Sequence, residues 1–261
     1  MDKREDLEKQ VNEILNDETI NRQIRINTVE QQFAVDEASS AIVYKLIGDL
    51  CYPDDNWYSS EYYTKAANIW ESQGVETVEL ADVCERAAKS YYGIMGGEEA
   101  EEFFMKALSI KEKLWGEGHP DLASLYNDIG IFYQYDPEKS IQYYQKAMDI
   151  WIKQYGEDHL YVSYSYYNMG TAYVKCKDYK NAVEFLNKAL VIRVRENGEN
   201  DPDVALVMGH IGGIYYEQGN YEKAIETFSK AYDILKRTVT SKDPCAKQMK
   251  KNLDAAKKKL G

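Results

Sequence analysis

Apolar residues recur at intervals of three and four along this 261-residue chain, with charged and polar residues between them. The stretch 123–155 shows the pattern most clearly, in two sets that a short polar segment separates. The first set is Tyr126, Ile129, Gly130 and Tyr133, and the second is Ile141, Tyr144, Ala147 and Ile150. Such intervals place each set on one face of a helix, and Asp136-Pro137 between them predicts a tight turn. Neither helix can bury its apolar face alone, so the hairpin predicts neighbours of the same kind.

The pattern returns on both sides of this hairpin. Small residues mark the places where the two helices of a hairpin are expected to cross closely, at Gly48, Ala88, Gly130, Gly170 and Gly212. These positions are 40, 42, 40 and 42 residues apart. A small residue also recurs in each second helix, at Ala66, Ala107, Ala147, Ala189 and Ala231. The spacing predicts five helical hairpins that stack into one array.

The segments between the hairpins carry signals that start helices. Pro120, Pro202 and Pro244 each lie beside an aspartate, and proline at the first helical position loses no hydrogen bond. We expect the repeats to fill 33–242, at about 35–75, 77–117, 119–157, 159–199 and 201–240. We interpret His119 and His159 as residues of these links and not as a metal pair.

The two ends of the chain do not fit the repeat. Residues 1–32 predict one or two capping helices over the open end of the stack, or an arm that folds onto a partner. Residues 243–261 begin like another first helix but lack a second one, which predicts a C-terminal capping helix. This end carries the one basic run, at Lys247, Lys250, Lys251, Lys257, Lys258 and Lys259. We interpret the run as a solvated helix face, with docking of an acidic partner as the alternative.

Composition and charge narrow the class of protein. No segment approaches the roughly 20 apolar residues of a membrane span, and the polar start of the chain is not that of a signal peptide. The formal net charge of −12 argues against a surface for nucleic acid or for anionic membranes. We therefore expect a cytoplasmic protein without a nucleic-acid or membrane partner, with a monomer favoured.

The cysteines do not indicate a disulfide framework or a metal site. Cys51, Cys84, Cys176 and Cys245 form no CxxC pair, and their spacing suits neither arrangement. We interpret them as reduced thiols, most of which pack in the interior. No metal site and no cofactor are expected.

Three stretches, at 126–147, 166–189 and 211–231, resemble a known repeat. Tyr126-x2-Ile129-Gly130-x2-Tyr133, with Tyr144 and Ala147 after it, resembles the tetratricopeptide pattern of small and large residues. The stretch 211–231 shows the same pattern, in Ile211-Gly212-x2-Tyr215 and then Gly219-Asn220-Tyr221. The usual repeat has about 34 residues. The longer period here is similar to kinesin light chain and nephrocystin-like repeats. The resemblance covers 35–260 and implies an all-α, right-handed superhelical solenoid of antiparallel helix pairs.

The resemblance also implies where a partner binds, because the first helices of such arrays line a concave groove. The groove candidates are Glu85, Lys89, Tyr92, Asn127, Tyr164, Tyr167, Asn168, Thr171, Lys175 and His210. No three consecutive repeats carry the lysine, asparagine and arginine set with which chaperone-tail-binding members grip a carboxylate. Asparagine side chains bond a peptide backbone, and tyrosines offer contact area at low entropic cost. The candidates therefore predict a groove of mixed polar and aromatic character.

The sequence as a whole predicts a non-catalytic scaffold or adaptor that binds a peptide segment or partner protein in this groove. One alternative is a structural module that self-associates through its end caps. Another is a regulatory module of an enzyme assembly. His210 is the histidine nearest the expected groove, but no serine, cysteine or carboxylate pair is spaced to assist it in catalysis.

Overall fold

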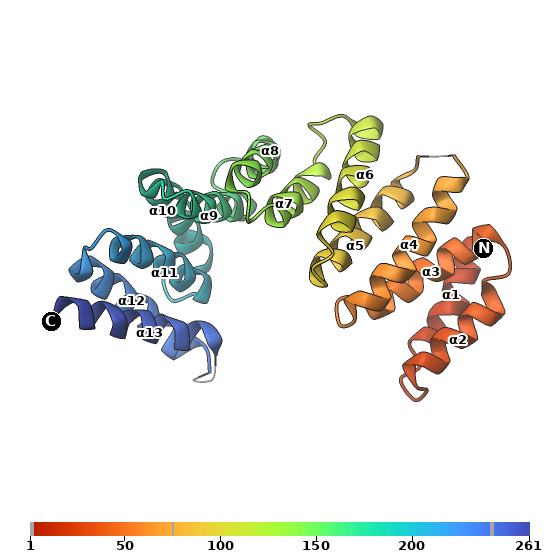
Figure 1. The fold of residues 1–261 in the computed structure, drawn as a ribbon, viewed down its shortest axis with the longest axis horizontal. Coiled ribbons are helices and arrows are strands. Elements are labelled where there is room, and N and C mark those ends of the chain that lie inside the picture. The colour runs from red at the N-terminus through yellow and green to blue at the C-terminus, as the bar shows by residue number, and fades with distance from the viewer. Residues whose placement is uncertain (1–2, 75, 241–242) are drawn as a thin grey trace. The chain divides into compact units, whose positions relative to one another are not determined.

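The structure, a computed structural model, describes residues 3–74, 76–240 and 243–261, where every regular element is an α-helix (Figure 1). The predicted all-α class is confirmed. Residues 1–2 of the expected cap, residue 75 of the first expected repeat and residues 241–242 at the end of the array lie outside the described residues. The chain divides into two compact units, an N-terminal unit (Met1–Leu122) and a C-terminal unit (Ala123–Gly261).

The N-terminal unit begins with two helices that pack on a helical hairpin. Its helices are α1 (Lys3–Leu15), α2 (Arg22–Phe33), α3 (Glu37–Cys51), α4 (Asn56–Ser72), α5 (Val78–Gly93) and α6 (Gly97–Trp115). Val11 and Leu15 of α1 and Ile26 and Val29 of α2 are buried in one cluster with Ile47 of α3. The segment 1–32, as far as it is described, thus covers the outer side of α3 with apolar side chains.

The C-terminal unit contains three further hairpins and a final helix. The helices are α7 (Leu122–Phe132, whose first residue belongs to the other unit), α8 (Pro137–Tyr155), α9 (Leu160–Lys175), α10 (Tyr179–Asn197), α11 (Pro202–Glu217), α12 (Tyr221–Thr238) and α13 (Pro244–Leu260). Helix α13 lies along α12 (Figure 1) and buries Met249 and Leu253 against Phe228 and Leu235. Its lysines lie on the exposed side of the helix.

The predicted close crossings are confirmed at the glycine anchors. A Cβ atom at Gly48 would lie 2.7 Å from the Tyr63 ring, and one at Gly170 would lie 2.7 Å from Leu186 Cγ. Gly130 and Gly212 meet Tyr144 and Phe228 in the same way, at 2.5 and 2.8 Å. Each large side chain comes from the second helix of the same hairpin, so the absence of a side chain at the anchor lets the two helices pack closely.

The helix starts follow the link residues, with one correction. Asp201 and Asp243 cap α11 and α13, with Pro202 and Pro244 in the first turn, and the His159 ring accepts the Tyr161 N–H at the start of α9. Pro120 does not start a helix as predicted. The carbonyl of His119 accepts the N–H of Leu122 in a turn, so α7 begins two residues later.

None of the helices that the structure describes is long and apolar enough to cross a membrane.

Candidate functional site

The residues expected in the groove lie in both units. Glu85, Lys89 and Tyr92 lie on α5 of the N-terminal unit. In the C-terminal unit Asn127 lies on α7 and His210 lies on α11. The remaining candidates share α9, at Tyr164, Tyr167, Asn168, Thr171 and Lys175. The candidates on α5 are surrounded by ion pairs, whereas those of the C-terminal unit line cavities.

The charged candidates on α5 take part in an ion network. The carboxylate of Glu85 pairs with Lys89 at 2.7 Å and with Lys111 of α6 at 2.8 Å. Lys111 also pairs with Asp82 at 2.8 Å, and its side chain is only 6% exposed. Burial would raise the pKa of Glu85, but Lys89 and Lys111 outweigh it, so the pKa is lowered. Glu85 therefore stays ionised beside two ammonium groups.

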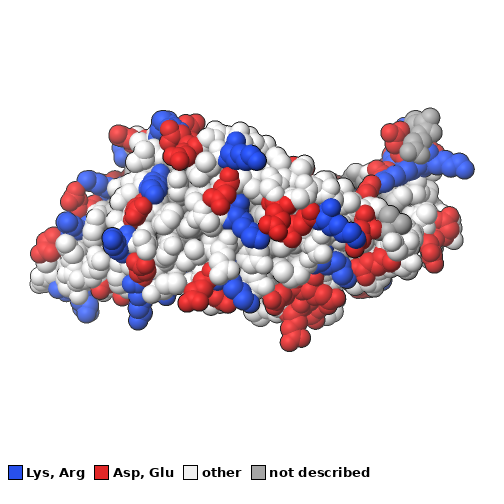
Figure 2. Space-filling view, turned by 90° about the horizontal axis from the view of Figure 1, so that it is seen from above, with Lys and Arg blue, Asp and Glu red and all other residues white. Residues whose placement is uncertain are grey.

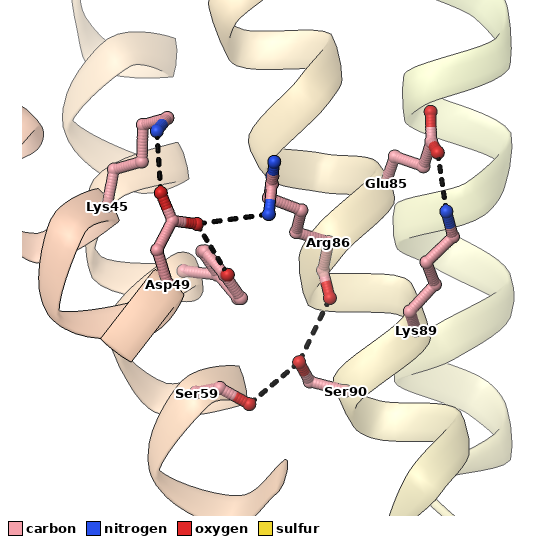
Figure 3. Close-up of polar contacts among 8 residues, drawn as sticks. Lys45, Asp49, Ser59, Glu85, Arg86, Lys89 and Ser90 are labelled. Atoms are coloured by element: carbon pink, nitrogen blue, oxygen red, sulfur yellow. Dashed lines mark hydrogen bonds and ion pairs between the residues drawn. The ribbon is translucent and has the colours of Figure 1, made fainter. Parts of the chain in front are cut away.

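A second network lies between α3 and α5. Asp49 pairs with Lys45 at 2.7 Å and with Arg86 at 3.1 Å, and it accepts the hydroxyl of Tyr63 at 2.7 Å (Figure 3). Next to it, the Ser59 hydroxyl donates to Ser90 at 2.8 Å. The charged side chains of α3 and α5 therefore pair with one another, and these ion pairs link the two helices.

Three adjoining cavities run along α7, α9, α11 and α13 of the C-terminal unit. The central cavity, of about 460 Å³, is lined by Asn127, Tyr164, Tyr167, Asn168 and Arg193. It shares Ile131 and Asn168 with a cavity of about 180 Å³, here the Lys175 cavity, which Thr171 and Lys175 also line. It shares Leu206 with a cavity of about 550 Å³ between α11 and α13, here the α13 cavity, which His210 lines. The structure thus brings the C-terminal candidates together along one path.

Polar groups of this path are already paired across the helices. The Asn168 amide donates to the Asn127 carbonyl oxygen at 3.0 Å, and Tyr167 Oη lies 2.9 Å from His210 Nε2. The Lys175 ammonium donates to the backbone carbonyl of Gln134 at 2.7 Å. His210 keeps an exposed edge, yet the atoms packed around its ring lower its pKa. The neutral ring is then the form that faces Tyr167.

Arg193 of α10 also lines the central cavity, although it is not among the residues that the sequence predicted. Its guanidinium lies 5.1 Å from the ring centre of Tyr164 and 4.8 Å from that of Tyr167. The residue is 3% exposed and lines the central cavity. The signal was present in the repeat spacing, because the same interval separates Ala88 from Gly170, Ala107 from Ala189 and Lys111 from Arg193. Arg193 lies on a second helix, whereas the resemblance implies a groove lined by first helices.

The α13 cavity explains two glycines within a helix. A Cβ atom at Gly209 would lie 2.4 Å from the terminal methyl of Met249, so a larger residue would require the flexible end of this side chain to move. Gly213 meets nothing within 4 Å and instead leaves the wall of the cavity without a side chain. The two residues give this cavity its width.

The cysteines are divided between interior and surface, so the prediction that most are packed is wrong. Cys51 and Cys84 are buried, and burial raises the pKa of Cys84 to about 12. Cys176 and Cys245 are exposed, and Cys245 lines the α13 cavity. Cys176 directly follows the last residue of α9, and Cys245 lies in the first turn of α13, so both stand at helix ends where solvent reaches them.

The other histidines serve the links. His119 stacks on Trp115 with ring centres 4.6 Å apart, and His159 stacks on Tyr155 at 4.4 Å. Each Nδ1 accepts a backbone N–H two residues later.

No group of three or more metal-binding side chains occurs among the described residues. On the face shown in Figure 2, basic and acidic residues lie side by side among neutral ones.

Comparison with known proteins identifies the repeat. Residues 131–190 and 161–237 match one sequence model described as tetratricopeptide repeat, and residues 96–121 match another of the same description. Together the matches reach just over half of the chain. No curated protein sequence matches it.

Solved structures share the fold over most of the chain. BtubC (BKLC) from P. vanneervenii is 20% identical, with 91% of this chain and 94% of that chain covered and a TM-score of 0.67. A putative kinesin light chain from Podosopora anserina is 16% identical, with coverage of 78% and 97% and a TM-score of 0.63. The apo form of RapI is 15% identical, with coverage of 98% of each chain and a TM-score of 0.63. The chain therefore belongs to the tetratricopeptide repeat family, and its long repeats have the fold of the kinesin light chain type.

Proposed function

We propose that this protein is a non-catalytic scaffold that binds an extended segment of a partner protein along α7, α9 and α11. Tetratricopeptide repeats act in general as scaffolds for protein interaction, which supports the general assignment. The observation that carries the specific one is the row of three neighbouring cavities in the C-terminal unit. Neighbouring cavities share lining residues, so an extended chain that passes over these shared residues reaches all three.

The chemistry of the path suits a peptide. Asn127 and Asn168 present amides, which bond backbone N–H and C=O groups without reading the side chain. Tyr164, exposed to 37%, and Tyr161, exposed to 46%, add aromatic surface at the rim. Polar groups that fix a backbone, together with apolar hollows that take side chains, are the common requirements of peptide recognition.

The N-terminal unit supports the scaffold in a different way. Its candidates Glu85 and Lys89 pair with each other and with Lys111, so a ligand that used them would have to break these ion pairs. We therefore place the binding surface in the C-terminal unit.

The arrangement around His210 favours a structural role over catalysis. Its Nε2 lies 2.9 Å from Tyr167 Oη, and its pKa is lowered by burial. The group that faces its Nε2 is a tyrosine hydroxyl, which is a poor nucleophile at neutral pH.

The proposal is tested by capture of partners from a cell extract with the wild-type chain and with Tyr167→Ala/Asn168→Ala. The double variant removes an aromatic wall and a backbone-binding amide, and we expect it to lose the captured proteins. The matched control is Glu226→Ala/Lys230→Ala, which removes an exposed ion pair on α12 away from the cavities. Retention of every partner by the groove variant would contradict the proposed surface.

A further inference from the structure

The α13 cavity is an elongated groove between two helices. On α11 its lining residues include Leu206, His210, Gly213 and Glu217, and on α13 the lining extends from Cys245 to Ala255. Intervals of three and four residues recur along both sets, so each set follows one face of its helix. At 1.5 Å per residue, the α13 side of the groove is about 15 Å long. A groove of this shape suits a chain that lies along the two helices.

The inner wall of the groove is apolar, and its rim is polar. Ile214, Phe228 and Met249 line it and are 1%, 2% and 6% exposed, so they also belong to the packed interior. Among its polar lining residues, Glu217 and Gln248 are exposed to solvent. With a volume of about 550 Å³, the groove has the size and the character of a small-molecule site.

Gly213 widens the groove without serving the packing of the helices. Its neighbour Gly212 is needed because Phe228 crosses it closely, whereas a Cβ atom at Gly213 would meet nothing within 4 Å. The backbone of Gly213 is that of an α-helix, so other residues could adopt it, and alanine would stabilise the helix. The groove thus gains width at the expense of helix stability, as is common at functional sites.

The charges and hydrogen-bonding groups of the groove favour an uncharged ligand. Among the described residues, Glu217 is the one charged side chain that lines it, so a bound carboxylate would find no counter-ion there. His210 supplies a polar contact, because its ring lines the groove and its lowered pKa keeps it neutral near pH 7. Its Nε2 lies 2.9 Å from Tyr167 Oη, and its Nδ1 has no hydrogen-bond partner among the described residues. A hydroxyl group of a ligand can bond this nitrogen in either tautomer of the ring.

We propose that the α13 cavity binds an uncharged amphiphile, a small molecule with an aliphatic chain along the groove and a hydroxyl group at His210. Each methylene that enters the groove is removed from water, and the hydroxyl keeps a hydrogen-bond partner. The inference goes beyond the proposed function, because the ligand is a small molecule that binds without a partner protein. The α13 cavity adjoins the central cavity at Leu206, so a bound amphiphile also narrows the surface that a partner segment can use.

The test uses the full chain and measures how 1-decanol slows the alkylation of Cys245 by iodoacetamide, followed by mass spectrometry. Cys245 is exposed and lines the groove, so a ligand that fills the groove should slow this reaction about fivefold or more. Cys176 is the internal control, because it is exposed and is not among the lining residues of the three cavities. Its rate of alkylation should stay unchanged.

Ligands with related chains define the polar group. From 1-octanol to 1-decanol, each added methylene should lower the dissociation constant about fourfold. Decanoate has the same chain but brings a charge without a counter-ion, and it should bind at least about tenfold more weakly than decanol. His210→Phe keeps a ring at the wall of the groove and should weaken the binding of decanol about fivefold.

Two glycine variants locate the ligand. Gly213→Leu places a side chain in the groove, so decanol should no longer protect Cys245, while the melting temperature should not fall. Gly97→Leu is the matched control in the N-terminal unit, at a glycine of α6 whose Cβ would likewise meet nothing within 4 Å. This variant should keep the full protection of Cys245.

Three results would overturn the proposal. If decanol slows the alkylation of Cys245 and Cys176 alike, or still protects Cys245 in Gly213→Leu, the alcohol acts outside the groove. Tighter binding of decanoate or decylamine than of decanol would show that the groove selects a charged group. Absence of protection up to the solubility limit of decanol would rule out the amphiphile. None of these results bears on the capture of partner proteins, which tests the proposed function separately.

Discussion

Two second helices of this protein carry a buried cation at the same place in the repeat, and their first helices treat it in opposite ways. Around Lys111, α5 supplies the carboxylates of Asp82 and Glu85 at 2.8 Å each, so the cation is neutralised within the protein. Around Arg193, α9 supplies two tyrosine rings and an open cavity. The anchors that hold each hairpin together stay the same, while a change of two first-helix side chains replaces internal ion pairs by tyrosine rings and leaves the cation at the wall of a cavity.

The largest effect should come from exchanging the two cations for methionine. Lys111→Met leaves Asp82 without its partner and Glu85 with Lys89 alone, and we expect a loss of about 3 kcal/mol in stability. Arg193→Met removes a charge that nothing pairs, so we expect the free energy of unfolding to hold or to rise. Urea unfolding followed by circular dichroism measures both. Equal losses in the two variants would show that Arg193 is as structural as Lys111.

A glycine exchange compares an anchor with a cavity wall. Gly170→Leu drives a side chain into Leu186, whose Cγ already lies 2.7 Å from the position of a Cβ, and should cost about 2 kcal/mol. Gly213→Leu meets open space and gains helix propensity, so the melting temperature should not fall. The second variant should nevertheless block the α13 cavity. An unchanged melting temperature in Gly170→Leu would disprove the close crossing.

The ion pairs of Glu85 in the N-terminal unit should make the stability of the protein depend on pH. The folded pKa of Glu85 lies below its usual value of 4.5, so its contribution is present above pH 4.5 and is lost as the pH falls through the folded pKa. Near neutrality Glu85→Gln should cost about 1.5 kcal/mol. The gap in melting temperature between wild type and variant should therefore narrow on acidification below 4.5. Glu226→Gln, in an exposed pair, should show almost no gap at any pH.

The smallest effect on stability should come from a change at Tyr167, one of the two tyrosines beside Arg193. Tyr167→Phe keeps the ring beside Arg193 and removes only the hydroxyl that lies 2.9 Å from His210 Nε2. We expect a loss of about 0.5 kcal/mol. The pKa of His210, followed by NMR titration, should shift measurably, whereas the free energy of unfolding should change little. A loss as large as that of Lys111→Met would mean that the hydroxyl, and not the ring, holds this site together.

The fold was predictable because its signals are local and repeated. The interval between Gly48, Ala88, Gly130, Gly170 and Gly212 gave the hairpins, and the link residues gave most of the helix starts. Pro120 was the exception, because a turn through His119 competes there with the first turn of a helix. The expectation of a binding groove came from the family resemblance alone, and it stays a prediction.

The individual site residues were less predictable. Choosing first-helix positions found Asn127, Tyr167 and Asn168 but passed over Arg193, which reaches the central cavity from the second helix. The same choice of positions grouped Glu85 and Lys89 with the α9 residues as groove candidates. In the structure these two residues pair with each other, and they lie in a different unit. Sequence distance does not reveal which charges are already paired, since Lys111 and Glu85 meet only when α6 packs on α5.

The sequence by itself determined the all-helical repeat, the five anchor positions and the polar and aromatic character of α9, because helical periodicity and small residues act within a single hairpin. Only the tertiary structure decided which charges neutralise one another and which cation stays without a partner. Burial and ion pairing depend on how neighbouring helices pack. The same position of the repeat therefore holds a stabilising ion pair at Lys111 and, two repeats later, an unpaired guanidinium at Arg193.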